Sequence, residues 1–412
     1  MDFQIYALVM PTLIGLWGLS KTQAGTLATA VLIIASVGGW IAGALADRIG
    51  RVRVLQITIL WFAVFTFLSG LTTSYWQLLL TRSLQGIGFG GEWAVGAVLI
   101  SEVVAPEIRG RVVGVMHSGW AVGYGTAVVL SALLFSSFSE IIAWRLLFFV
   151  GLLPTVIVFF IWRYVDEPKV FLENRTRTTE GKGYAFWEIF SSDYIGRTTT
   201  ATILATGVYG GNYVLITWLP SYLKMVLHLS LASTSGYLAL TISGSFVGAF
   251  VNAYLSDLIG RRYTFVVCAL CQAVTLAAYI LVSISPLTRI LLGFVLGTMQ
   301  SGTAAGMGAA FSELFPTRIR ATGQGFSANA GRAIGALFPT LVGILSVRMP
   351  LGKAMAACAL VAYGILVVAA LMMPETRGID LSQIADRNEE IPPLVQITKP
   401  DMNISIQREK KR

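Results

Sequence analysis

The sequence predicts an all-helical membrane protein made of two related bundles of six helices. Hydrophobic residues make up 55% of the 412 residues and charged residues only 12%, too little charge to coat a soluble globular protein of this size. Apolar runs of about 20 residues recur almost from end to end, which is the length that a helix needs to span a bilayer. The runs are continuous rather than alternating, which argues against the strands of a membrane barrel.

A repeat at half the chain length divides these helices into two bundles. Gly43–Arg53 reads GALADRIGRVR and Ala253–Arg262 reads AYLSDLIGRR, so the second copy follows after 210 residues (257 − 47). EVVAPEIR at 102–109 and ELFPTRIR at 313–320 repeat after 211 residues (313 − 102). Such a chain contains two similar units. We predict an N-terminal bundle over 1–164, a linker over 165–196, a C-terminal bundle over 197–373 and a cytoplasmic tail over 374–412.

The first helix is predicted to be truncated, because the chain opens with MDFQIYALVMP and carries an acid inside an apolar segment. If the stretch 11–20 approaches one membrane surface, Met1 begins near the middle of the bilayer and Asp2 lies close to mid-membrane. The alternative is an ordinary exposed N-terminus whose acid has no role.

The remaining spans follow in order after Lys21. The polar stretch from Val165 to Gly196 is the one long internal connection, so it is assigned as the linker. The spans are predicted over 22–46, 54–73, 76–104, 110–135 and 142–164 in the first bundle, and over 197–224, 230–256, 263–283, 287–314, 320–346 and 352–373 in the second.

Cations concentrate on alternate connections, which predicts the orientation. By the positive-inside rule, the cation-rich connections and both termini lie in the cytoplasm and the protein spans the inner or plasma membrane. This placement also explains the net charge of +9, so no nucleic-acid partner is expected. The cation-rich connections include Arg48, Arg51, Arg53, Arg109, Arg111, Arg261, Arg262, Arg318 and Arg320.

Matched acids and bases stand at the cytoplasmic ends of the predicted helices in both bundles. Such pairs are suited to hold the bundles together when the cytoplasmic side is closed and to separate when it opens. Helix capping and weak surface ion pairing account for the same residues equally well. The candidate cytoplasmic gate comprises Asp47, Arg51, Glu102, Arg109, Asp257, Arg261, Glu313 and Arg320.

Four motifs resemble those of the major facilitator superfamily. GALADRIGRVR resembles the loop signature between its second and third helices, and RSLQGIGFG from Arg82 resembles its fourth-helix motif, R-x-x-Q-G-x-G. VDEPKVF after the sixth predicted helix and MPETRG after the twelfth resemble the paired motifs that follow each bundle in its sugar and organic-acid branches. The resemblance covers essentially the whole chain and implies a secondary transporter.

Two longer segments resemble a narrower group. GIGFGGEWAVGAVLISE and FSANAGRAIGALFPT are similar to the sialate and monocarboxylate proton symporters of this superfamily. Asp2 resembles the second acid of the D-x-x-D element on the first helix of these and of aromatic-acid symporters, and the first acid of that element is absent here. The fifth helix carries GWAVGYG in place of the G-P-containing signature of drug/proton antiporters, which favours uptake over efflux.

Arg332 is predicted to bind the carboxylate of the substrate. A helix starting near Arg320 places it about 20 Å along the axis, near mid-membrane. A lipid-facing arginine there costs at least ~2.5 kcal/mol, so the side chain should face a wet cavity or an anion. Its guanidinium matches a planar carboxylate, and Asn329 shares its face. The alternative is a structural pair with an acid on a neighbouring helix.

The fourth helix is predicted to line the cavity, because its polar and aromatic side chains are spaced by three and four residues. In the symporters that the chain resembles, the fourth-helix arginine pairs with the first-helix acid, which implies that Asp2 and Arg82 couple transport to a proton. A static buried ion pair is the alternative. Glu92 either carries the proton instead or balances an arginine. The lining residues are Arg82, Gln85, Phe89, Glu92 and Trp93.

Two more helices are predicted to contribute substrate-binding side chains. Their mixture of aromatic and polar groups fits a ligand with both a charge and an apolar or ring portion. The histidine is as often a packing residue as a titrating one. The candidates are His117, Trp120 and Tyr124 on the fifth helix and Asn212 and Tyr213, with Tyr209, on the seventh.

Enzymatic activity is not expected. Gly86-x-Gly88-x-x-Gly91 spells the dinucleotide-binding pattern, but it lies inside an apolar helix, where small residues allow close helix packing. The same reading applies to Gly302, Gly306 and Gly308. No catalytic triad, metal-ligand cluster or phosphate loop is visible in the sequence, so neither a cofactor nor a metal is predicted.

These observations together predict a monomeric secondary transporter that takes up an organic anion, such as a monocarboxylate, a sialate or an aromatic acid, with protons by alternating access. Its partners are the anion, protons and the lipid bilayer. An exporter or uniporter of the same fold is one alternative. A transporter-like receptor that binds its ligand without moving it is another.

Overall fold

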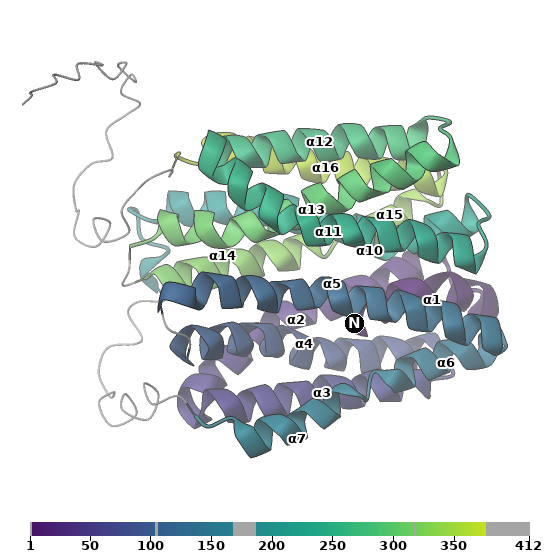
Figure 1. Cartoon of the computed structure of the whole chain (residues 1–412), viewed down its shortest axis with the longest axis horizontal. Coiled ribbons are helices and arrows are strands. Elements are labelled where there is room, and N and C mark those ends of the chain that lie inside the picture. Colours follow the sequence, from purple (N-terminus) through teal and green to yellow (C-terminus); the bar gives the residue numbers. More distant parts are fainter. Residues whose placement is uncertain (1, 104–105, 168–186, 317–318, 376–412) are drawn as a thin grey trace, which may run out of the picture.

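The computed structural model describes residues 2–103, 106–167, 187–316 and 319–375. All regular secondary structure in these ranges is α-helical, which confirms the predicted class. Figure 1 shows the helices lying side by side in two groups, which we call the N-terminal and C-terminal halves. The N-terminal half contains α1 (Asp2–Trp17), α2 (Lys21–Ile49), α3 (Arg51–Gly70), α4 (Tyr75–Val103), α5 (Pro106–Ser137), α6 (Glu140–Val150) and α7 (Pro154–Tyr164).

The C-terminal half repeats this order. It contains α10 (Ile195–Met225), α11 (Leu231–Ile259), α12 (Arg261–Leu281), α13 (Pro286–Leu314), α14 (Arg320–Gly335), α15 (Phe338–Leu345) and α16 (Leu351–Met372). The short α6 and α7 together correspond to one predicted span, and so do α14 and α15.

These two spans, predicted as continuous over 142–164 and 320–346, are each interrupted. Pro154 is the first residue of α7 and Pro339 the second of α15. A proline lacks the backbone N–H that a continuing helix needs, so it favours a new helix start. Each break therefore follows from a proline that the span assignment passed over.

Nine helical stretches of the described ranges are long and apolar enough to cross a membrane. The α1 stretch Gln4–Trp17 is apolar but shorter. Although α10 has 31 residues, it is not among the nine, because threonines, glycines and polar side chains such as Asn212 lower its hydropathy. A transmembrane helix with this composition is typical of one that faces a polar site.

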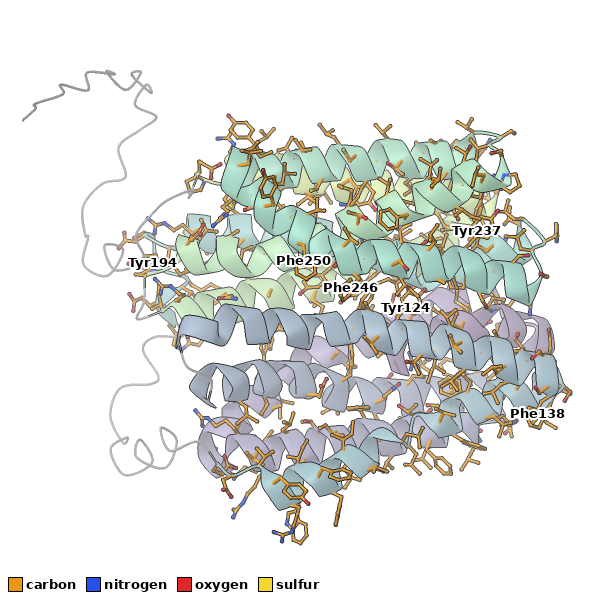
Figure 2. All side chains as sticks on the ribbon, viewed as in Figure 1. Tyr124, Phe138, Tyr194, Tyr237, Phe246 and Phe250 are labelled. Carbon is orange, nitrogen blue, oxygen red and sulfur yellow. The ribbon has the colours of Figure 1, made fainter. Side chains whose placement is uncertain are left out.

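The outer surface of the bundle is apolar. Phe246 and Phe250 on α11 are 49% and 67% exposed, and Phe138 at the α5–α6 junction is similarly exposed. Figure 2 shows such side chains projecting outward from the helices. A surface of this kind is stable only against lipid, so the protein is an integral membrane protein.

Glycines bring equivalent helix pairs together in the two halves. A Cβ on Gly90 of α4 would collide with the Ala35 carbonyl of α2, and one on Gly297 of α13 with the Thr241 carbonyl of α11. Gly86, Gly88 and Gly91 also face neighbouring helices closely, which confirms the packing role predicted for this motif, as do Gly302 and Gly306. For Gly308 the prediction was wrong, because nothing lies within 4 Å of an added Cβ.

A glutamate caps the start of the third helix in each half. Glu167 accepts hydrogen bonds from the backbone N–H groups of Arg51 (2.8 Å) and Arg53 (3.2 Å), which begin α3. Glu375 accepts bonds from Arg261 (2.9 Å) and Arg262 (3.2 Å), which begin α12. Both acids belong to the motifs that follow each bundle. The capping carboxylate neutralises the helix N-terminus and fixes the arginine-rich end of each half.

Candidate substrate site between the two halves

Arg332 lies in the last turn of α14 and is only 8% exposed. Its Nη2 donates to the Tyr209 hydroxyl at 3.4 Å, and its guanidinium carbon lies 5.2 Å from the centre of the Tyr209 ring. The guanidinium also interacts with Tyr213, whose ring stacks on that of Tyr209 at 5.6 Å. A phenol hydroxyl and its ring face solvate a guanidinium without cancelling its charge.

This tyrosine pair lies where the halves meet. Tyr213 and Ile216 of α10 pack in one apolar cluster with Val31 and Leu32 of α2, and Phe89 of α4 packs against the same cluster. Asn329 is buried one turn before Arg332, and its amide lies 3.5 Å from the position of a Cβ on Gly39 of α2. Arg332 and Asn329 therefore stand at the interface between the halves.

The halves touch on both sides of Arg332. On the side of the α14–α15 break, Thr29 of α2 donates to the Ala336 carbonyl at 2.6 Å and accepts from the Thr340 hydroxyl at 2.8 Å. Toward the arginine-rich end, Trp40 of α2 stacks on Phe326 of α14 at 6.0 Å. The site is thus enclosed in this conformation.

Arg82 occupies a separate buried network in the N-terminal half. It is 0% exposed, its Nη1 donates to Gln85 at 2.5 Å, and Gln85 in turn donates to Thr66 of α3 at 2.6 Å. The Tyr6 ring of α1 lies 5.1 Å from the guanidinium carbon. The Gln85 amide and the Tyr6 ring are among the groups that hold this charge inside the helix bundle.

Several predicted site residues are placed only in part. Glu92 is half-buried in α4. The side chains of Asp2, Trp93 and His117 lie outside what the structure describes, so the predicted pair of Asp2 with Arg82 stays a prediction. The described contacts of Arg82 and Arg332 share no residue.

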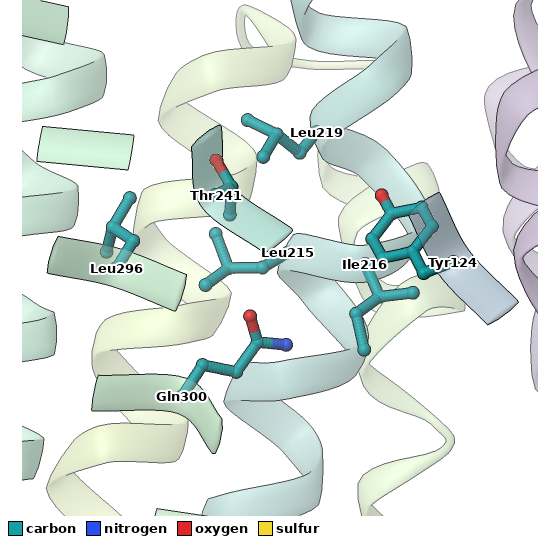
Figure 3. A pocket seen from close by; sticks show the side chains of 7 residues that line it. All are labelled: Tyr124, Leu215, Ile216, Leu219, Thr241, Leu296 and Gln300. Carbon is teal, nitrogen blue, oxygen red and sulfur yellow. The ribbon is translucent and has the colours of Figure 1, made fainter. Parts of the chain in front are cut away.

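A small cavity lies beside the arginine site. Trp120 and Tyr124 of α5 are in edge contact at 5.7 Å, and Tyr124 lines the cavity from the N-terminal half. Asn212 is buried on α10, and its carbonyl accepts from Gln300 of α13 at 3.5 Å. The cavity has room for about one water molecule, so this conformation does not admit an organic acid. The lining residues, shown in Figure 3, are Tyr124, Leu215, Ile216, Leu219, Thr241, Leu296 and Gln300.

The described gate residues contact their own half. Arg261 of α12 pairs with Glu313 of α13 at 3.3 Å, and Arg320 donates to the Phe315 carbonyl at 3.2 Å. Arg51 donates to the Ala46 carbonyl at 2.9 Å. In this conformation these contacts brace each half internally. The side chains of Asp47, Glu102, Arg109 and Asp257 lie outside the described residues.

At the opposite end, an ion pair joins the halves. Lys224 at the end of α10 contacts Glu140 at the start of α6 at 3.1 Å and donates to Thr12 of α1 at 3.3 Å. Glu140 is about half exposed, so the pair contributes little energy, of the order of 0–1 kcal/mol.

Sequence reasoning missed Thr29, Thr241 and Gln300. Threonines and glutamines are ordinary within apolar helices, and only a neighbouring helix shows which of them face a cavity. One signal for Gln300 was available, because it is a buried amide in a helix that otherwise holds small and apolar residues.

Comparisons with known proteins give the family context. The profile of the Major Facilitator Superfamily matches residues 1–339. The chain is similar to the probable 4-methylmuconolactone transporter of Cupriavidus pinatubonensis, with 39% identity over 399 residues, covering 96% of this chain and 92% of the relative. It is also similar to the sialic acid transporter NanX of Escherichia coli, with 26% identity over 357 residues, covering 85% of each.

The fold is similar to that of a solved transporter. The inward-open xylose transporter XylE from E. coli superposes with a TM-score of 0.72, 18% identity, and coverage of 93% of this chain and 96% of that chain. At this identity the likeness concerns the fold alone, and it confirms the predicted arrangement of two helix bundles.

Proposed function

The chain belongs to the Major Facilitator Superfamily, a family of transporters and not of enzymes. We propose that it imports a small organic anion together with protons by alternating access. The observation that carries the proposal is Arg332, a cation buried between the halves beside the hydroxyl groups and rings of Tyr209 and Tyr213. A charge held in this way is suited to receive an anion.

A carboxylate is the anion that fits best. A guanidinium offers two parallel N–H donors, which match the two oxygens of a carboxylate. The tyrosine pair beside it offers hydroxyl groups and ring faces for the rest of the ligand. Sialates and aromatic acids combine a carboxylate with such a remainder, and one of the two relatives is named as a sialic acid transporter.

The contacts between the halves suggest how access alternates. Entry from one side requires Thr29 to leave Ala336 and Thr340, and entry from the other requires Trp40 to leave Phe326. Each group of contacts is small, so a bound ligand can shift the equilibrium between the conformations open to the two sides of the membrane. The cytoplasmic gate residues would act at the arginine-rich end, with both termini on that side.

Proton coupling is assigned to Asp2, Arg82 and Glu92. Protonation of Asp2 would remove one charge and free Arg82 to take another partner, which links a proton to a conformational change. The protein is proposed to work as a monomer in the cell membrane. The full substrate-binding set is Arg332, Asn329, Gln85, Trp93, His117, Trp120, Tyr124, Asn212 and Tyr213.

Uptake by purified protein in proteoliposomes tests this function. With an inward proton gradient, the symporter should accumulate a carboxylate above its external concentration, and Asp2→Asn should stop accumulation while counterflow exchange continues. A uniporter would only equilibrate the acid, and a receptor would bind it without flux. Failure of lactate, benzoate and sialate alike to accumulate would overturn the proposal.

A further inference from the structure

The small cavity beside Arg332 has two chemically different walls. Leu215, Ile216 and Leu219 of α10 and Leu296 of α13 make it apolar, while Thr241 and Gln300 bring polar groups to the same space. Figure 3 shows these side chains converging from three helices of the C-terminal half, with Tyr124 of α5 opposite them. Six of the seven lining residues therefore belong to the half that also carries Arg332.

The cavity continues the arginine site along α10. Tyr209 and Tyr213 contact Arg332, and Ile216 packs in one cluster with Tyr213 while lining the cavity. At 1.5 Å per residue, Tyr209 and Ile216 are about 10 Å apart along the helix axis. A ligand held at Arg332 by its carboxylate would thus direct its other end toward this cavity.

Gln300 has unused hydrogen-bonding capacity at the cavity, and so has its neighbour Asn212, which does not line the cavity. Gln300 is 6% exposed, and its Nε2 reaches the Asn212 carbonyl only at 3.5 Å, the limit of a hydrogen bond. The Asn212 Oδ1 is buried and has no hydrogen-bond partner within the described residues. Buried amides that are so poorly satisfied cost free energy, which a ligand oxygen or hydroxyl can recover.

We propose that this cavity is the subsite for the end of the substrate remote from the carboxylate, and that Gln300 selects acids with a second oxygen there. This inference rests on the proposed function and narrows its substrate class to compact cyclic acids that carry a hydroxyl or carbonyl opposite the carboxylate. The apolar wall receives the ring, and the Gln300 amide pairs with the distal oxygen.

The subsite opens when the halves separate. Tyr124 is the N-terminal contribution to the lining, so movement of α5 away from α10 and α13 enlarges the space while the C-terminal wall stays assembled. The present room for about one water molecule is therefore the closed form of the recess.

Binding of two matched probes, benzoate and 4-hydroxybenzoate, tests the subsite in the full-length protein. Wild type should bind 4-hydroxybenzoate about tenfold more tightly than benzoate, and Gln300→Leu should bring the ratio close to one while benzoate affinity is kept. The control Gln272→Leu removes another buried amide of the same half that does not line the cavity, and it should keep the ratio. An unchanged ratio in Gln300→Leu overturns the subsite.

A second variant tests the subsite independently, in case Gln300→Leu does not fold. Leu296→Phe fills the cavity and should weaken 4-hydroxybenzoate at least tenfold, while acetate, which reaches only Arg332, binds as in wild type. Equal binding of 4-hydroxybenzoate to this variant and wild type contradicts the subsite. If wild type binds none of the three acids, the subsite proposal fails, whereas the proposed function fails only if lactate, benzoate and sialate also do not accumulate.

Discussion

The two halves are alike in their helical framework, that is, in how helices are capped and packed, and differ in the surroundings of their buried arginines. In both, a glutamate caps the third helix and glycines join an equivalent helix pair. The likeness does not extend to their buried arginines. The N-terminal half buries Arg82 completely among Gln85, Thr66 and Tyr6, whereas the C-terminal half holds Arg332 at the interface against two tyrosines.

This difference helps to distinguish the residues that hold the helices together from those that form the substrate site. A repeated feature serves a task that both halves share, such as fixing helix ends and spacing. The charge of Arg332 is not repeated in the other half, whereas Arg82 has a counterpart at Arg289. Arg332 is therefore the better candidate for substrate, and Arg82 for a role inside its own half, such as sensing a proton.

Locking the halves together should have the largest effect. The Thr29 and Thr340 hydroxyls lie 2.8 Å apart across the interface, so T29C/T340C is placed to form a disulfide. The oxidised variant should lose uptake completely and recover it on reduction, because the halves can no longer separate. T29C alone, with the native Cys271 still exposed, controls for oxidation elsewhere. Full transport by the cross-linked protein would show that this contact is not broken during the cycle.

Glycine substitutions should show whether the helix packing of the two halves is equivalent. Gly90→Ala and Gly297→Ala should each lower the free energy of unfolding by about 1–3 kcal/mol, because the added methyl group meets backbone of the neighbouring helix. The controls Gly96→Ala on α4 and Gly308→Ala on α13 have space and should be neutral or stabilising by up to about 1 kcal/mol. Thermal unfolding in detergent measures all four. A large loss in one half only would break the proposed equivalence.

Removing the caps should have a smaller effect. Glu167→Ala and Glu375→Ala each delete acceptors for two backbone N–H groups and should cost about 1 kcal/mol of stability. Hydrogen exchange at the first turns of α3 and α12 should rise by similar factors in the two variants. Protection that stays unchanged at either helix would show that the corresponding glutamate is not its cap.

The helical framework could be predicted from the sequence because its motifs occur twice, once in each half. The motif containing Asp47 and its copy containing Asp257 fixed the helix order, and Arg332 stood out because an arginine inside an apolar run is costly. The breaks before Pro154 and Pro339 and the roles of Thr29 and Gln300 were missed. The two breaks follow from prolines that the sequence itself shows, whereas the roles of Thr29 and Gln300 depend on a neighbouring helix that no single segment encodes.

The most direct test of Arg332 compares an acid with its neutral isostere. Benzoate and benzamide binding should be measured by calorimetry on wild type, Arg332→Gln and Arg332→Lys. We predict that wild type prefers benzoate, that Arg332→Gln loses at least ~2 kcal/mol of benzoate affinity while benzamide is unaffected, and that Arg332→Lys falls between them. A glutamine variant that binds benzoate as tightly as wild type would contradict the assignment of Arg332 as the carboxylate site.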